Sequence, residues 1–460
     1  MPATAAPIRA EIRATLALAA PLAGANLAQM AMGLTNAVVV GRLGGAALAA
    51  AGLGAGVYFT LVMICQGVLV AVAPLAAHAI GADDRPAAAR IAGAGMLLAL
   101  LLALPVFALL TIAPQLLVLL GYEKALAADI ADFLWAIRWG SPAFMFFVVL
   151  RAMLSAASRV RPIVVVLLLG VPANAALNWA LVFGELGMPA LGIVGSGCAT
   201  AIVQWAMALG LAGYMALMPT GPKLRFARRG GEFGRIIRVG LPISGLLALE
   251  VGVFNGTGIL MGLLGADALG AHQLAMNFAS LTFMVPLGIA QAATVRVAFE
   301  LGRGAREAAR RAGFVALALG GVAMLIPCVV MLIFPLTIAG IYLDLADPKN
   351  HGTALIAVQL LAIAALFQVF DGVQVIAVGA LRGYRDTAVP MLIAAFGYWG
   401  AGFAISWVLA FPLGFGAAGL WWGLALGLAI VALLLALRFQ HRSRVAYRGS
   451  AVVEAQPLPG

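Results

Sequence analysis

The sequence is poor in charge. Only 10% of its 460 residues are charged, against roughly 25% in an ordinary soluble domain. Hydrophobic residues make up 64% of the chain, which is more apolar surface than a soluble fold of this length can bury. The apolar runs are continuous, about 20 residues long, and lack the alternation of a β-barrel. The composition therefore excludes a soluble protein and predicts a polytopic, all-α membrane protein.

The sequence also lacks the motifs of catalysis and nucleotide binding. No P-loop, Ser/His/Asp or zinc-ligand pattern is present, and the three cysteines have no metal or redox spacing. Glycine clusters such as residues 52–56 are not followed by Lys-Ser, so we assign them to helix packing. These absences argue against an enzyme, a bound cofactor and an ATP-driven pump. Energy for transport would then have to come from an ion gradient.

The formal charge of +11 does not indicate a nucleic-acid partner, because the basic residues lie mostly in short loops between apolar runs. When the loops are assigned alternately to two sides, one side collects nearly all of the arginines. The positive-inside rule then places both termini in the cytoplasm. We expect a multi-pass protein of the cell inner membrane, in contact with lipid and monomeric.

Charged loops divide the chain into twelve predicted spans. They cover about residues 15–40, 53–80, 91–113, 133–157, 162–183, 192–218, 239–264, 269–297, 314–341, 354–381, 388–411 and 416–437. The predicted domains are an N-lobe (1–218), a basic cytoplasmic linker (219–238), a C-lobe (239–440) and a cytoplasmic tail (441–460) without assigned structure at its end.

The two halves are related by an internal repeat. Shifting the chain by 221 residues aligns Gly67 with Gly288, and Arg85 and Arg90 with Arg306 and Arg311. Six spans per repeat is an even number, so both halves face the same way in the membrane. The sequence predicts two parallel-repeat, six-helix lobes around a central cleft, an architecture typical of a rocking transporter.

Two carboxylates lie deep in the apolar runs of the second half. Glu250 is about 12 residues from Arg238, and Asp371 is about 11 residues from Arg382. At 1.5 Å per residue, both lie roughly 16–18 Å from the cytoplasmic boundary, near the bilayer midplane. No basic residue is expected at that depth in this half, so the pair would carry a proton or hold a small hard cation. A buried, hydrogen-bonded acid without a transport role is the alternative.

Uncharged polar residues are further candidates for an ion or substrate cavity. In the first half these are Asn36 and the pair Asn174 and Asn178, one helical turn apart, where Pro172 could break the helix. Hydrogen bonding between helices is an equally good interpretation of the asparagines. In the second half the candidates are Asn255, Gln273, Asn277 and Tyr398, with His272 and Trp399 nearby. For His272 we favour packing.

Several of these motifs together resemble the multidrug and toxic compound extrusion (MATE) transporters of the NorM type, over about residues 10–440. The motifs are Ala20-Pro21, Met32-Gly33 leading to Gly41-Arg42-Leu43-Gly44, Pro172 to Asn178 followed by Gly192, Gly195 and Gly197, then Glu250, Ala271-His272-Gln273 with Asn277-Phe278, and FDGVQVIAVGALRGYRDT from Phe370. The resemblance implies two six-helix lobes, exchange of Na+ or H+ for amphipathic organic compounds, and a coupling role for Glu250 and Asp371. An aspartate is usual in the first span of that family, whereas this chain has Asn36, which favours coupling at the two second-half acids.

The resulting hypothesis is a secondary active multidrug efflux antiporter that works by alternating access. Na+ at Asp371 and Glu250 is the preferred coupling ion, and H+ is the second choice. A lipid-linked precursor flippase of the same superfamily, an intramembrane aspartyl-type enzyme and a channel are the alternatives.

Overall fold

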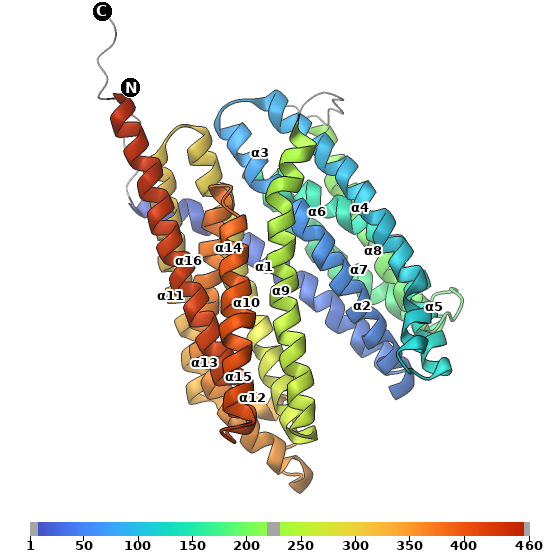
Figure 1. The fold of residues 1–460 in the computed structure, drawn as a ribbon. Coiled ribbons are helices and arrows are strands. Elements are labelled where there is room, and N and C mark those ends of the chain that lie inside the picture. Colours follow the sequence, from blue (N-terminus) through green and yellow to red (C-terminus); the bar gives the residue numbers. More distant parts are fainter. Residues whose placement is uncertain (1–7, 219–230, 455–460) are drawn as a thin grey trace, which may run out of the picture. The chain divides into compact units, whose positions relative to one another are not determined.

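The computed structural model describes residues 8–218 and 231–454, and within them every regular element is helical (Figure 1). Twelve helices, some of them in two or three pieces, are long and apolar enough to cross a membrane in these described ranges. Each corresponds to one of the twelve spans predicted from the sequence. The predicted all-α, twelve-span fold class is confirmed.

The chain forms two compact units. The N-terminal unit comprises Gly24–Ser244, and the C-terminal unit comprises Met1–Ala23 together with Gly245–Gly460. These boundaries differ from the predicted lobes, because the first part of the opening helix belongs to the C-terminal unit and the first part of α9 to the N-terminal unit. The predicted linker, 219–238, lies largely outside the described residues, and α9 has already begun by its end.

The N-terminal unit contains most of α1 and the helices that follow it. The elements are α1 (Ile8–Gly41), α2 (Gly45–Val70), α3 (Val72–Gly81), α4 (Arg85–Leu119), α5 (Lys124–Ile137), the 3-10 turn η1 (Arg138–Gly140), α6 (Ser141–Ala156), α7 (Arg161–Phe183), α8 (Ile193–Leu217) and the start of α9 (Glu232–Leu263). Helix α7 packs against α8, and α4 packs against α6. Helix α7 continues unbroken through Pro172, so the proposed break at this proline is wrong.

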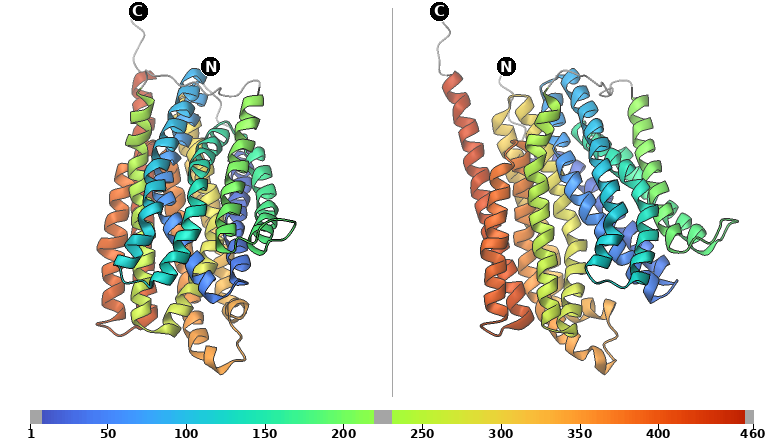
Figure 2. Two further views of the ribbon diagram at one scale, coloured as in Figure 1. Left: turned by 90° about the vertical axis from the view of Figure 1, so that its right-hand side faces the viewer. Right: turned by 45° about the vertical axis from the view of Figure 1, so that its right-hand side comes forward.

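The C-terminal unit is built around α13. Besides the first part of α1, its elements are the rest of α9, α10 (Ala266–Gly302), α11 (Arg306–Ile333), α12 (Pro335–Tyr342), the 3-10 turn η2 (Pro348–Asn350), α13 (His351–Gly383), α14 (Ala388–Ala394), the π-helix η3 (Ala395–Phe403), α15 (Ala404–Ala410) and α16 (Gly416–Glu454). Helix α13 packs against α10, α11 and α16, which run alongside it in the further views (Figure 2). Trp421, Phe367 and Phe439 are the largest fully buried side chains of the described part of this unit.

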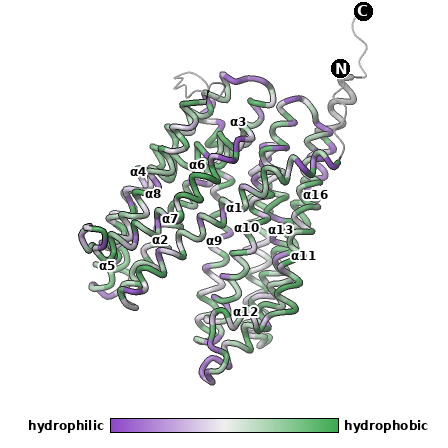
Figure 3. The backbone as a smooth tube through the Cα atoms, turned by 180° about the vertical axis from the view of Figure 1, so that it is seen from behind, coloured by the Kyte–Doolittle hydropathy of each residue, from purple (hydrophilic) through white to green (hydrophobic). Residues whose placement is uncertain are grey.

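The ends of the helices are more hydrophilic, and their middles are mostly apolar (Figure 3). At one such end, Asp84 caps α4 by accepting a hydrogen bond from the Ala87 amide at 2.9 Å, and a proline follows at the first turn. At the far end of the chain, helix α16 extends to Glu454. The region predicted as a tail from residue 441 is therefore helical up to that point, because the apolar helix before it continues without a stop signal.

Candidate ion-coupling site

Two of the predicted site residues come together inside the C-terminal unit. Asp371 lies on α13 and is 8% exposed, and Glu250 lies half-buried on α9. The two carboxylates lie within electrostatic reach of each other. Tyr398, from η3, is 4% exposed and interacts electrostatically with both. Two acids and a phenol from three different helices thus form one polar cluster in an otherwise apolar helix bundle.

Several buried oxygens of this cluster have no hydrogen-bond partner among the described residues. They are Asp371 Oδ1, the Tyr398 hydroxyl and Gln374 Oε1. Gln374 lies three residues after Asp371, on the same side of α13, and is 1% exposed. Sequence reasoning missed Gln374, although its spacing from Asp371 was a usable signal. Buried polar atoms are normally paired, so these oxygens are available to coordinate a ligand.

The π-helix η3 positions Tyr398. Residues 395–403 form a wide helical turn between α14 and α15, and π-helical segments are rare and often found at functional sites. Gly397 and Gly402 let this wide turn pack closely on Gly427 of α16. On the opposite side, Trp399 donates its indole N–H to the carbonyl of Leu249 at 3.1 Å, next to Glu250. The π-helix therefore buries the phenol and fixes the backbone beside the second acid.

Arg382 takes part in the cluster, contrary to the sequence prediction. The sequence places it at the cytoplasmic boundary of its span, about 11 residues from Asp371, and predicts no basic group at the depth of the acids. In the structure, Arg382 lies in the last turn of α13, is half-buried, and interacts electrostatically with Glu250 and Tyr398. Its Nε is buried and has no hydrogen-bond partner within the described part of the chain. The prediction was wrong because it used only the position of the backbone, whereas a long arginine side chain can place its charge well away from its own Cα.

The asparagines of the N-terminal unit form a separate, uncharged network. Asn36 Oδ1 accepts hydrogen bonds from Asn174 Nδ2 at 2.7 Å and from Asn178 Nδ2 at 3.0 Å. Asn36 Nδ2 donates to the hydroxyl of Thr200 at 3.0 Å, and this hydroxyl donates in turn to the carbonyl of Ser196. The network joins α1, α7 and α8. It supports the alternative of hydrogen bonding between helices, because the oxygen that Asn36 would offer to a cation already accepts two bonds.

The remaining predicted cavity residues are exposed, except for His272. Asn255 is exposed on α9, and Gln273 and Asn277 form an exposed pair on α10, joined by a 3.0 Å hydrogen bond. No hydrogen bond in the described residues links them to the acids. His272 is buried and accepts a hydrogen bond from the indole N–H of Trp421 at 3.2 Å, which is a packing role.

The sequence matches a family model over both halves of the chain. The model is that of MatE, and it matches residues 21–180 and 242–408. The chain belongs to the MatE family. The two matched segments correspond to the two halves of the internal repeat.

Curated relatives support the same assignment over nearly the full length. The chain is 42% identical to "Probable multidrug resistance protein NorM" of Mesorhizobium japonicum over 95% of each chain. It is 44% identical to "Multidrug resistance protein NorM" of Burkholderia vietnamiensis, covering 93% of this chain and 94% of that one. The chain therefore belongs with the NorM-type members of the MatE family, and the aspartyl-enzyme alternative loses its support.

Solved structures share the fold at lower identity. The eukaryotic MATE transporter AtDTX14 aligns with a TM-score of 0.84 at 21% identity, over 95% of this chain and 98% of that one. An outward-facing multidrug resistance MATE family transporter of the MOP superfamily aligns with a TM-score of 0.86 at 20% identity, over 95% and 97% of the two chains. At these identities the likeness shows the fold alone.

Proposed function

We propose that this chain is an antiporter that exports cationic and amphipathic organic compounds and is driven by Na+ entering through the acid cluster of the C-terminal unit. Na+ would bind Asp371 and Glu250 and favour one of two conformations of that unit, so that ion entry and substrate exit alternate. H+ is the alternative coupling ion, because two neighbouring acids at this depth can also share a proton. The curated relatives are named multidrug resistance proteins, which supports the substrate class.

The observation that carries the proposal is the unpaired oxygen of Asp371 beside Glu250. Hard cations prefer oxygen ligands, and Asp371, Gln374 and Tyr398 offer three buried oxygens without partners among the described residues. In the same part of the chain, no three His, Cys, Asp or Glu side chains are grouped as a metal site. The donors therefore fit a monovalent cation better than a tightly held divalent one.

The exposed amides support a water-accessible path for the substrate. Asn255, Gln273 and Asn277 are exposed on apolar, span-forming helices. Amide groups exposed at membrane depth are costly in lipid and are tolerated where they face water or protein. We further propose that the protein is a monomer in the inner membrane, with both termini in the cytoplasm, on the basis of its loop charges.

Efflux from proteoliposomes tests the proposal. Vesicles that contain the purified protein and a cationic dye are given either an imposed Na+ gradient or an imposed pH gradient. We expect Na+ to drive dye transport and Asp371→Asn to reduce it at least tenfold at an equal amount of reconstituted protein. The exposed Asp132→Asn is the matched control and should transport like the wild type. Undiminished gradient-driven efflux by Asp371→Asn would overturn the assignment, and efflux driven only by the pH gradient would replace Na+ by H+.

A further inference from the structure

A second polar cluster lies on the arginine-rich side of the C-terminal unit, where α13 ends, α11 begins and α16 passes beside them. Its centre is Tyr384, the first residue after α13 and part of the motif FDGVQVIAVGALRGYRDT. The Tyr384 ring packs edge-on against Phe439 of α16, with 6.0 Å between centroids, and Phe439 packs against Phe314 of α11 at 5.2 Å. These three rings form a continuous aromatic cluster next to the end of α13. Nothing in the transport proposal uses this cluster.

Two arginines lie beside this aromatic cluster. The Arg310 guanidinium lies over the Phe314 ring, 5.5 Å from its centroid, and Arg442 follows Phe439 by three residues, on the same side of α16. Both arginines interact electrostatically with Tyr384. Burial raises the pKa of the Tyr384 hydroxyl to about 12, despite the opposing effect of these two cations. The hydroxyl is therefore protonated at physiological pH and can donate a hydrogen bond.

The donors of this cluster lack acceptors. The Tyr384 hydroxyl and Arg310 Nε are buried and have no hydrogen-bond partner among the described residues. In the same residues, no carboxylate forms an ion pair with Arg310 or Arg442. The nearby acid Asp386 pairs with Arg438 at 2.9 Å, and Glu307 is exposed. Loop arginines that merely orient a membrane protein stay in water, whereas a buried N–H and a buried O–H without acceptors are costly.

We propose that Arg310, Arg442 and Tyr384 form a binding site for the phosphate group of an anionic phospholipid. A phosphate offers several acceptor oxygens and a negative charge, which complement one O–H donor and two guanidinium groups. Pockets of basic side chains between membrane helices on the cytoplasmic side are known to hold anionic head groups. The bound phosphate would satisfy the buried donors and join α11, α16 and the segment after α13.

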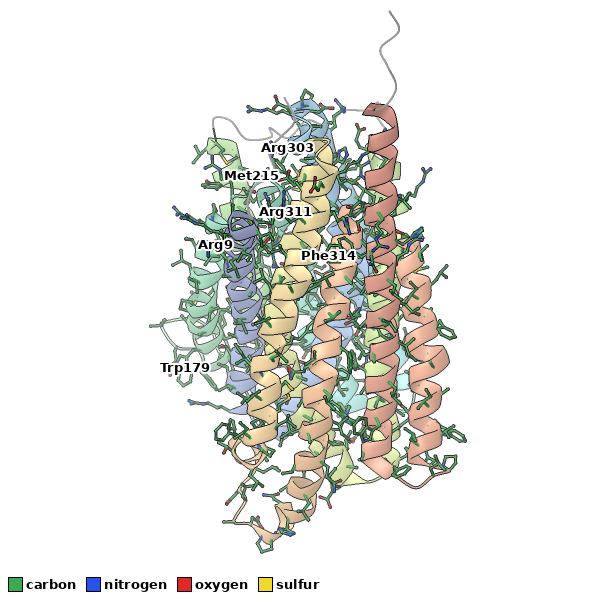
Figure 4. All side chains as sticks on the ribbon, turned by 90° about the vertical axis from the view of Figure 1, so that its left-hand side faces the viewer. Arg9, Trp179, Met215, Arg303, Arg311 and Phe314 are labelled. Carbon is green, nitrogen blue, oxygen red and sulfur yellow. The ribbon has the colours of Figure 1, made fainter. Side chains whose placement is uncertain are left out.

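The surroundings favour a lipid over a free phosphate ion. Phe314 is 38% exposed beside Arg310, so apolar surface is available to an acyl chain directly next to the donors. Figure 4 shows Arg303, just before α11, and then Arg311 and Phe314 on α11, following one another from the arginine-rich end into the apolar part of the unit. A ligand with a charged head and an apolar tail would contact both the basic side chains and the adjacent apolar surface. Inorganic phosphate would contact the donors alone.

Thermal unfolding of the purified full chain in detergent tests the site. The melting temperature is followed while dioleoyl-phosphatidylglycerol, dioleoyl-phosphatidylcholine or inorganic phosphate is added. We expect phosphatidylglycerol to raise the melting temperature of the wild type at a concentration at least tenfold lower than in the double variant Arg310→Gln/Arg442→Gln. The control Arg303→Gln/Arg444→Gln removes the same charge from the same end of the unit and should respond like the wild type.

Each outcome decides the proposal. An equal response of the site variant and the wild type overturns it. Protection by inorganic phosphate alone, with no further effect of phosphatidylglycerol, overturns the lipid assignment. If the double variant does not fold, Tyr384→Phe removes a single O–H from the site, and we expect it to need about threefold more phosphatidylglycerol than the wild type. A wild-type response by Tyr384→Phe would then refute the role of the hydroxyl and with it the site as proposed.

Discussion

Gly288 packs so closely against Ala23 that a β-carbon on the glycine would lie 2.6 Å from the Ala23 amide nitrogen. The same contact exists in the other unit, where a β-carbon on Gly67 would lie 2.6 Å from the Cα of Ser244. Both residues of the second pair are related to those of the first by the 221-residue shift of the internal repeat. The repeat seen in the sequence therefore preserves an individual backbone contact.

The two contacts also lie at the residues where the chain passes from one unit to the other. Ala23 is the last residue of the N-terminal segment that belongs to the C-terminal unit, and Ser244 is the last residue of the N-terminal unit. In each repeat, the beginning of the first helix belongs to the unit formed by the other repeat. Small residues at a helix contact allow this close approach.

We expect Gly288→Ala to destabilise the protein by about 1–3 kcal/mol, because the new methyl group must displace backbone rather than a flexible side chain. The measurement is thermal unfolding of the purified protein in detergent. Gly24→Ala is the matched control, since a β-carbon there meets nothing within 4 Å. In a helix this control should be neutral or slightly stabilising. Equal melting temperatures for the two variants would contradict the tight contact.

The helices and their number could be predicted from the sequence because each apolar run carries its own signal. The pairing of distant charges could not. Glu11 accepts two hydrogen bonds from Arg296, at 3.0 and 2.7 Å, across 285 residues of sequence, and nothing local to either residue indicates its partner. The exchange of helix ends between units escaped prediction for the same reason, since the apolar run of α1 is continuous through Ala23.

The candidate site could be predicted only in part. Depth along the chain was enough to single out Glu250 and Asp371, because a carboxylate in a long apolar run is rare. Arg382 was misjudged, since its position near a helix end does not indicate which way its side chain points. Tyr398 was a candidate by residue type alone, and the π-helix that buries it has no signature in the apolar, glycine-rich run 395–403.

Arg382→Gln should raise the apparent affinity for the coupling cation. In the wild type the guanidinium offsets part of the negative charge that the cation would meet at Glu250. Removing a charge interaction of about 1 kcal/mol changes an equilibrium constant roughly fivefold, so the half-saturating Na+ concentration should fall by about that factor. The measurement is dye efflux from proteoliposomes as a function of external Na+. The exposed Arg385→Gln serves as the control, and a rise in half-saturating Na+ in Arg382→Gln would refute the compensating role.

The asparagine network predicts different outcomes for two substitutions of Asn36. Asn36→Leu leaves the amides of Asn174 and Asn178 without the oxygen that accepts from both, and should cost about 1–3 kcal/mol of stability. Asn36→Asp keeps that acceptor, and its carboxylate can also accept from the Thr200 hydroxyl, so it should unfold within a few degrees of the wild type. The measurement is the melting temperature of both variants at pH 8, a pH at which a hydrated carboxylate is ionised. A wild-type melting temperature for Asn36→Leu would show that the network adds nothing to stability.

The arginine between Glu11 and Glu300 should be the most sensitive charged position in the C-terminal unit. Arg296 contacts Glu11 at 2.7 Å and Glu300 at 3.2 Å, and both acids are at most 5% exposed. Arg296→Met would leave these two buried carboxylates with one weak, partly exposed cationic partner among the described residues, Arg303, at 3.4 Å from Glu300. Breaking a buried pair from one side typically costs about 3–5 kcal/mol. We therefore expect Arg296→Met to be poorly folded, with a low melting temperature and early elution as aggregate in gel filtration.

Adding Glu11→Gln to Arg296→Met removes one of the two unpaired buried charges and should recover part of the lost stability. If the double variant were less stable than Arg296→Met alone, repulsion between stranded acids would not be the cause, and the loss would have to come from the packing of α10.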